Sequence, residues 1–296
     1  MMDENIEKFI SFMKDIKNVS DNTAISYKRD LTKMKDYFMT LGIDRENKIN
    51  ETNLNSYILW LEKNGCASST VSRAISSMKA YFYFLLQNGD VVHDPAMLVK
   101  NPVIEKKAPK TLTMNQLEKL LNAPACSNSK EIRDKAMLEL MCSTGIRVSE
   151  IINLTLDNTN LNLSYIIVTN GKSKERIIPF SESCKIAIEN YLMSSRGELL
   201  KEKESNLLFV NCQGKAMSRQ GFWKILKGYG ELAGITEDIT PHTLRHSFAV
   251  NMIGSGANMN ALQEILGHST VTTTQAYANL KKKELENNKK CLCNVV

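Results

Sequence analysis

The groups best suited to chemistry gather in the last third of this 296-residue chain. Three of its four histidines fall in the segment TPHTLRHSFAVNMIGSGANMNALQEILGH, which begins at Thr240. Thr240 can cap a helix whose first turn holds a proline, and this helix places His242, Arg245 and His246 on one face. Since a guanidinium binds anions and an imidazole exchanges a proton near neutral pH, such a face could hold an anion and move a proton.

Two further candidates follow along the chain. Glycines end the first helix, and a second helix over about 259–266 ends at Gly267, which places His268 just past a helix end. Another helix then carries Tyr277. A histidine or tyrosine taken alone is usually structural, so only the combination of these residues indicates a site.

Two common hydrolytic sites do not fit these residues. His242 and His246 have the spacing of a zinc-binding pair, but the glutamate of an HExxH motif is missing and no third ligand is evident. The GxSxG turn of a serine hydrolase is missing as well. These residues therefore favour neither a zinc site nor a serine hydrolase.

The net positive charge of the chain comes entirely from its second part. Residues 1–105 hold 13 Lys and Arg against 14 Asp and Glu, a balance of −1, while residues 106–296 hold 25 against 18, a balance of +7. An excess of this kind fits a domain that grips a polyanion, although many proteins that bind no nucleic acid carry a similar excess.

The cysteines and the apolar runs indicate the compartment. Seven cysteines are scattered without a CxxC pair, which favours a reducing environment over a disulfide framework or zinc ribbon. The N-terminus is polar and acidic, and no apolar run approaches the ~20 residues needed to span a bilayer. We expect a cytoplasmic protein that does not contact a membrane. The tail that contains Cys291 and Cys293 receives no assigned role.

The first hundred residues read as an all-helical domain. Apolar residues at helical spacing predict a helix that ends at Gly42, one over 51–63, and one capped by Ser68 or Ser69 that ends before Gly89. Asp94-Pro95 predicts a short final helix. The segment NPVIEKKAPK at 101–110 holds two prolines and three lysines, as in an extended linker. We therefore predict domains over 1–100 and 111–296.

The second domain reads as mainly helical with a small antiparallel sheet. Helices are expected near 116–121, over 131–142 and from Val148. A strand over 165–169, an Asn-Gly turn and a strand over 176–180 predict one hairpin. The remainder is expected to be helical to about residue 287. The fold class is thus an all-α domain followed by an α+β domain.

Five motifs in the second domain occur in a characteristic order. They are TGIRVSE at 144–150, GKSKER at 171–176, HTLRH at 242–246, LGH at 266–268 and the tyrosine at 277. In this order they resemble the tyrosine recombinase family, and within it the Xer-type recombinases of bacteria. The N-terminal stretches NTAISYKRDL and SSTVSRAISSMKAYFYFLLQNG are similar to the core-binding domain of that family, which is SAM-like.

The resemblance implies a set of roles at the matching positions. The catalytic set would be Arg147, Lys172, His242, Arg245, His268 and Tyr277, with Glu150 supporting it one helical turn beyond the first arginine. Two guanidiniums and an imidazole would hold the non-bridging oxygens of a phosphate, which gain negative charge during phosphoryl transfer.

The remaining groups would move protons. The Tyr277 hydroxyl, with an ordinary pKa near ~10, would be the nucleophile, and His242 would accept its proton. Lys172 at the hairpin tip would protonate the leaving 5′ oxygen, with Lys174 as the competing choice. GKSKER lacks the second glycine that many relatives have after the lysine, which would stiffen the turn.

The resemblance also implies the partners. Two domains would form a C-shaped clamp on double-stranded DNA, and four identical or paired subunits would act on two sites, with a division-linked protein as a possible regulator. The expected function is chromosome dimer resolution through a 3′-phosphotyrosine bond, which keeps the phosphodiester energy so that rejoining needs no ATP. The resemblance implies no metal and no cofactor, because the arginines would do the work often given to magnesium. The alternatives are an integrase of a phage or mobile element, a topoisomerase-like enzyme, and a DNA-binding protein without catalysis.

Overall fold

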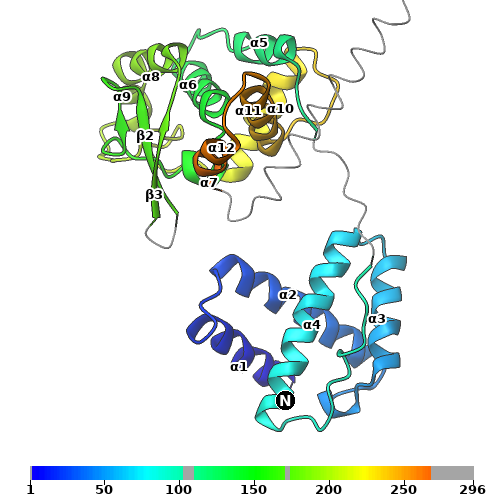
Figure 1. Cartoon of the computed structure of the whole chain (residues 1–296). Coiled ribbons are helices and arrows are strands. Elements are labelled where there is room, and N and C mark those ends of the chain that lie inside the picture. The colour runs from blue at the N-terminus through cyan, green and yellow to red at the C-terminus, as the bar shows by residue number, and fades with distance from the viewer. Residues whose placement is uncertain (1, 103–109, 171–173, 268–296) are drawn as a thin grey trace, which may run out of the picture. The chain divides into compact units, whose positions relative to one another are not determined.

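The computed structural model describes residues 2–102, 110–170 and 174–267. The chain divides into two compact units, residues 1–107 and 108–296 (Figure 1). Within the described ranges, no helix has both the length and the apolar character that crossing a bilayer requires.

The first unit is a bundle built around one long helix. Its elements are α1 (Met2–Asp15), α2 (Asp21–Thr40), the short 3-10 helix η1 (Glu46–Lys48), α3 (Glu51–Lys63) and α4 (Ser68–Asn88). Helix α4 packs against α1, α2 and α3, so its apolar residues are buried on several sides. Ser20 and Asn50 cap α2 and α3. Gly89 ends α4 in the left-handed conformation, as predicted, but the expected cap at Ser68 or Ser69 is wrong, because Ala67 is the N-cap and both serines lie inside the helix.

The prediction of a short helix at Asp94-Pro95 is wrong. Residues 95–98 form a turn, in which the Asp94 carboxylate accepts a hydrogen bond from the Ala96 amide at 2.8 Å. This side chain satisfies the local backbone, and Ala96 and Val99 are buried in the domain core, so the chain follows the core surface instead of starting another helix.

The second unit surrounds a buried helix, α6 (Ser129–Thr144). Its apolar residues are buried on all sides, and none of the following is more than 1% exposed: Ala136, Met137, Leu138, Leu140 and Met141. Around α6 lie α5 (Met114–Asn122), α8 (Glu182–Ser194), α9 (Arg196–Leu200) and α11 (Pro241–Gly254). Helices α7 (Val148–Ile151), α10 (Arg219–Leu232) and α12 (Met259–Leu266) complete the described part of the unit.

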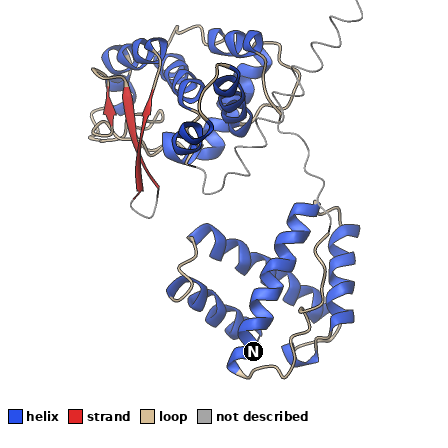
Figure 2. Ribbon diagram, viewed as in Figure 1, coloured by secondary structure: helices blue, strands red, loops and turns tan. Residues whose placement is uncertain are grey.

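A three-stranded antiparallel sheet lies at one side of this unit (Figure 2). Its strands are β1 (Thr159–Asn160), β2 (Tyr165–Asn170) and β3 (Lys174–Pro179), with Ile166 opposite Ile178 and Val168 opposite Arg176. The hairpin is confirmed, although β3 begins two residues earlier than expected. Ile166, Val168 and Ile178 face the core, so the position of Arg176 in this alternation also points inward.

The expectation that the rest of the domain is helical is wrong between α9 and α10. Residues 201–218 form turns and extended segments, and Leu207 makes a β-bridge with Thr155. The Leu208 amide donates to the Leu154 carbonyl at 2.8 Å, which holds Leu208, Phe209 and Val210 in the core. An extended apolar triplet is buried here by pairing with a loop, which hydrophobic periodicity alone does not reveal.

Gly145 joins three elements of the second unit. It ends α6 in the left-handed conformation with φ +60°, and a Cβ atom at this position would overlap the Phe248 ring of α11 and press on Leu266 of α12. Only glycine combines this backbone geometry with such close packing.

We therefore expect Gly145→Ala to lower the free energy of unfolding by about 2–4 kcal/mol, through left-handed strain and overpacking. Gly228→Ala is the control, because Gly228 lies inside α10 with open space where its Cβ would be. This control should raise the free energy by about 0.5–1 kcal/mol. Urea titration measures both, and equal effects of the two substitutions would contradict the packing assigned to Gly145.

Candidate active site

Arg147 is positioned by the sharp turn between α6 and α7. Gly145 reverses the chain after α6, and Arg147 then occupies the N-cap of α7, where its amide donates to the Glu150 carboxylate at 2.9 Å. The Arg147 guanidinium donates to the other Glu150 oxygen at 3.0 Å and to the Gly267 carbonyl at 2.8 Å. One carboxylate thus fixes both the backbone and the side chain of Arg147.

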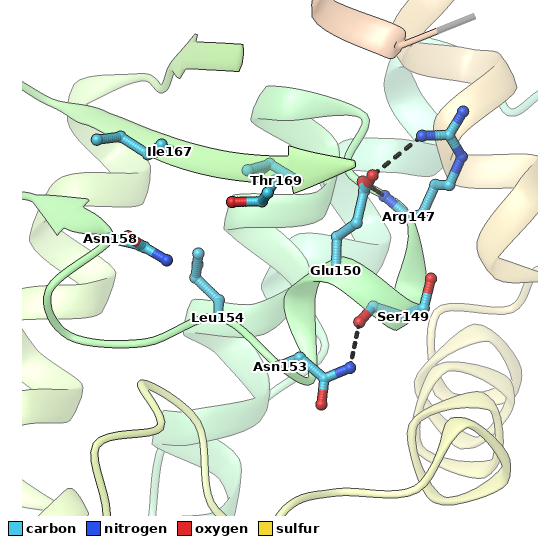
Figure 3. Close-up of a pocket in the computed structure, with 9 residues that line it drawn as sticks. Arg147, Ser149, Glu150, Asn153, Leu154, Asn158, Ile167 and Thr169 are labelled. Atoms are coloured by element: carbon cyan, nitrogen blue, oxygen red, sulfur yellow. Dashed lines mark hydrogen bonds and ion pairs between the residues drawn. The ribbon is translucent and has the colours of Figure 1, made fainter. Parts of the chain in front are cut away.

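The Arg147 side chain remains accessible on one side, with 34% of its surface exposed. It lies at the edge of a cavity of about 440 Å³ between α7 and β2, beside Glu150 (Figure 3). Polar side chains also line this cavity: Ser149, Asn153, Asn158 and Thr169. A guanidinium that is held from one side and open on another can still donate hydrogen bonds to a ligand.

Arg245 lies on α11, which begins as the sequence predicts. Thr240 caps the helix by accepting a hydrogen bond from the Thr243 amide at 3.2 Å. Arg245 is only 4% exposed, and its guanidinium donates to the Gly145 carbonyl at 2.6 Å and to the Leu266 carbonyl. These contacts place Arg245 directly behind the turn that carries Arg147.

His242 and His246 share a face of α11 with Arg245. Their rings lie 6.3 Å apart between centroids, at an interplanar angle of 28°, with His242 exposed and His246 half-buried. Burial lowers the pKa of His246, and the nearby His242 and Arg245 charges lower it further. His246 is therefore held mostly neutral, while His242 is open to solvent and to a ligand.

Arg176 is a buried residue of the site for which no role was expected. Its side chain on β3 is 5% exposed, and its guanidinium donates to Glu150 at 2.7 Å and to the Ile265 carbonyl at 2.8 Å. The one signal in the sequence is an arginine at an inward-facing position of the strand, between Glu175 and the exposed Ile177. A buried arginine requires several acceptors, so this pattern indicates a partner in the domain interior.

The C-terminal end of α12 brings the three arginines together. Three consecutive carbonyls, those of Ile265, Leu266 and Gly267, accept hydrogen bonds from Arg176, Arg245 and Arg147 respectively. The last carbonyls of a helix have no partner within the helix and carry partial negative charge, so cations are favourable there. Gly267 ends α12 in the left-handed conformation, with φ 59°.

Glu150 connects two of these arginines. Burial raises its pKa, but the hydrogen bonds from Arg176 and the Arg147 amide and the charges of both arginines outweigh that effect, so the pKa lies below its ordinary value of 4.5. Glu150 therefore remains ionised at neutral pH, between two permanent cations.

Three of the expected catalytic residues lie outside the described residues: Lys172, His268 and Tyr277. The Lys174 side chain is outside them too. By sequence, His268 directly follows Gly267, and Lys172 lies two residues before β3. Among the described residues, no group of three or more His, Cys, Asp or Glu side chains is arranged to hold a metal ion.

Two family descriptions match most of the chain. The description "Phage integrase family" matches residues 110–284, and "Phage integrase, N-terminal SAM-like domain" matches residues 6–89. The chain belongs to the phage integrase family. This tyrosine recombinase therefore consists of a SAM-like N-terminal domain and a catalytic domain, and both lie within the units that the structure separates.

Relatives that match nearly the whole chain are Xer recombinases. The chain is 39% identical to tyrosine recombinase XerD of Oceanobacillus iheyensis, with 97% of each chain covered. It is 38% identical to tyrosine recombinase XerC of Roseiflexus sp., with 94% of this chain and 90% of that protein covered. The enzyme is a site-specific recombinase of the Xer type.

Solved structures share the fold. The crystal structure of XerH site-specific recombinase bound to a palindromic difH substrate aligns with 98% of this chain and 84% of that chain, with a TM-score of 0.79 and 21% identity. A lambda integrase dimer bound to a core site aligns with a TM-score of 0.73 and 14% identity, covering 93% of this chain and 94% of that one. At these identities the likeness describes the fold alone.

The lowered pKa of Glu150 predicts a pH dependence of stability. A depressed carboxyl pKa stabilises the folded state above the unfolded value, and this contribution is lost as the pH falls below 4.5 through the folded value. At pH 7, Glu150→Gln should lower the free energy of unfolding by about 2–4 kcal/mol, because Arg176 loses its buried counter-charge. Urea titrations at pH 7 and at decreasing acid pH should show the gap between parent and variant closing. A gap that is independent of pH would contradict the ion pairs.

Proposed function

We propose that this recombinase cleaves double-stranded DNA by attack of the Tyr277 hydroxyl on a phosphate held by Arg147 and Arg245. The observation that supports the proposal is that both arginines donate to neighbouring carbonyls at the end of α12. His268 directly follows Gly267, the last of these carbonyl residues, in the chain. A phosphate beside these guanidiniums would thus lie close to three of the groups expected to bind it.

The charges of this site suit a phosphoryl transfer. The reacting phosphate gains negative charge on its non-bridging oxygens, and guanidiniums stay positive at any working pH. His242 is exposed on the same helix face as Arg245, where it can accept the tyrosine proton. The Tyr277 oxygen forms a bond to phosphorus as the bond to the 5′ oxygen breaks, and Lys172 protonates that oxygen. The products are a 3′-phosphotyrosine and a free 5′ hydroxyl, and the reverse reaction rejoins the strands.

The proposed biological role is the resolution of chromosome dimers. Support comes from relatives named XerD and XerC, which cover almost the whole chain. The two domains would clamp the DNA, and four subunits, identical or of two related kinds, would join two sites. Because phosphate contacts dominate such binding, affinity should fall steeply with salt. A division-linked regulator is part of this proposal.

Integration of a phage or mobile element is the second candidate. It would use the same residues, and the transposon Tn1549 integrase in complex with a circular intermediate DNA has a similar fold, with a TM-score of 0.70 and 20% identity. The higher identity to Xer proteins over full length favours the chromosomal role. Recombination between two copies of a chromosomal site, without an element's own ends, would separate the two.

The covalent step is tested on a nicked duplex that traps the cleaved strand. We expect a protein–DNA adduct on a denaturing gel in the presence of EDTA, and we expect Tyr277→Phe to form none while binding the same duplex with unchanged Kd. Removal of a single hydroxyl preserves packing, so binding separates from chemistry. An adduct formed by Tyr277→Phe, or an adduct that requires a divalent metal, would contradict the mechanism.

The general acid is tested with a leaving group that needs no proton. On an ordinary duplex, Lys172→Ala should slow cleavage by about 100-fold or more. Replacing the bridging 5′ oxygen with sulfur gives a thiol leaving group with a pKa of about 8.5, and this substrate should restore the rate. Lys174→Ala is the matched control. Rescue of Lys174→Ala instead would assign the role to Lys174, and rescue of neither would remove general acid catalysis from the hairpin.

A further inference from the structure

One carboxylate serves two buried or half-buried guanidiniums in the catalytic domain. One Glu150 oxygen accepts from the Arg147 side chain at 3.0 Å, and the other accepts from Arg176 at 2.7 Å and from the Arg147 amide at 2.9 Å. Glu150 is 11% exposed and Arg176 is 5% exposed, so solvent screens this arrangement weakly. The two cations and one anion sum to a single positive charge.

The position of that positive charge depends on Arg176. Without Arg176, Glu150 would have Arg147 as its one cationic partner in this arrangement, and a carboxylate can accept two parallel hydrogen bonds from one guanidinium. The resulting pair would be neutral, and a phosphate would have to compete with Glu150 for the N–H groups of Arg147. With Arg176 present, the carboxylate charge is shared, and Arg147 keeps a net positive charge for a ligand.

Arg176 also connects two segments that carry catalytic groups. Its Nε donates to the Ile265 carbonyl at 2.8 Å, three residues before His268. Along the chain it lies four residues after Lys172, on the strand that returns from the hairpin. The side chain therefore links the return strand of the lysine hairpin to the end of α12.

We infer that Arg176 is a positioning residue of this recombinase, which holds the Glu150 carboxylate away from full pairing with Arg147 and anchors the end of α12. This inference rests on the proposed function, because it assumes that Arg147 binds the phosphate. Arg176 itself does not touch the substrate in this account.

The test compares Arg176→Gln with the double variant Arg176→Gln/Glu150→Gln. Arg176→Gln should bind duplex DNA within about 3-fold of the parent and cleave a nicked duplex about 100-fold more slowly in a single turnover. Removing the Glu150 charge as well frees Arg147 again, so the double variant should recover at least about tenfold of the lost rate. Rates are compared per folded protein, because removing both members of a buried ion pair can also restore stability. A residue needed only for folding would show no recovery in this rate.

Arg133→Gln is the matched control for the loss of a buried arginine. Arg133 is 3% exposed, pairs with Asp134 at 2.7 Å and donates to the Val210 carbonyl at 3.1 Å, so its environment resembles that of Arg176. This variant should lose stability in urea, but its folded fraction should cleave within about 3-fold of the parent.

Arg176→Lys is the second control, because it keeps the positive charge beside Glu150. It should cleave within about tenfold of the parent, and it keeps the test open if Arg176→Gln does not fold.

Several results would overturn the inference. Two of them concern the pair itself: Arg176→Gln cleaves at the parental rate, or the double variant cleaves no faster than Arg176→Gln at equal folding. The other two concern the controls: Arg133→Gln loses as much cleavage rate as Arg176→Gln, or Arg176→Lys cleaves as slowly as Arg176→Gln. If the parent forms no adduct, the proposed function fails and the inference fails with it. If the parent forms the adduct and the double variant shows no recovery, only the role of Arg176 is wrong.

Discussion

The three arginines around the C-terminal end of α12 donate hydrogen bonds to the carbonyls that end the helix. A helix ends with carbonyls that have no partner inside the helix, and a buried guanidinium has five N–H groups that need acceptors. Here the carbonyls of residues 265–267 each receive one arginine, from β3, α11 and the turn before α7. Segments far apart in the sequence are thereby fixed at one point of the catalytic domain.

These hydrogen bonds bring the surrounding segments so close together that few side chains fit between them. Gly145 has to lack a side chain because Phe248 and Leu266 press against it, and its own carbonyl is an acceptor for Arg245. Glu150 caps the turn that follows and balances part of the charge. The excess positive charge that remains suits the phosphate of the proposed reaction, and it persists at neutral pH because guanidiniums stay protonated and Glu150 stays ionised.

Much of this arrangement could be predicted from the sequence. The caps at Thr240 and Gly267, the hairpin and the long helices follow from local rules and are confirmed. The contact between Glu150 and Arg147 is also local, since they lie three residues apart on one short helix. These features depend on side chains that meet within a few residues of each other.

Two of the features that sequence reasoning missed depend on long-range pairing, and the third is a local turn held on a core surface. Arg176 meets its acceptor at Ile265 across 89 residues, and no periodicity reports such a contact. The extended segment around Leu208 is buried by a loop near Leu154, and the Asp94 turn replaces a helix because the chain follows a core surface. In each case tertiary packing overrides a local preference that reads plausibly by itself.

In the proposed mechanism, Arg147 neutralises the negative charge of the reacting phosphate. The most direct measurement is the cleavage rate of Arg147→Ala on a duplex whose scissile phosphate is replaced by an uncharged methylphosphonate. We expect the rate to fall by about 100-fold or more on the normal phosphate and by less than about tenfold on the neutral one, relative to the parent on each substrate. Equal losses on the two substrates would show that Arg147 supports the fold or binds elsewhere, and would contradict its role at the reacting phosphate.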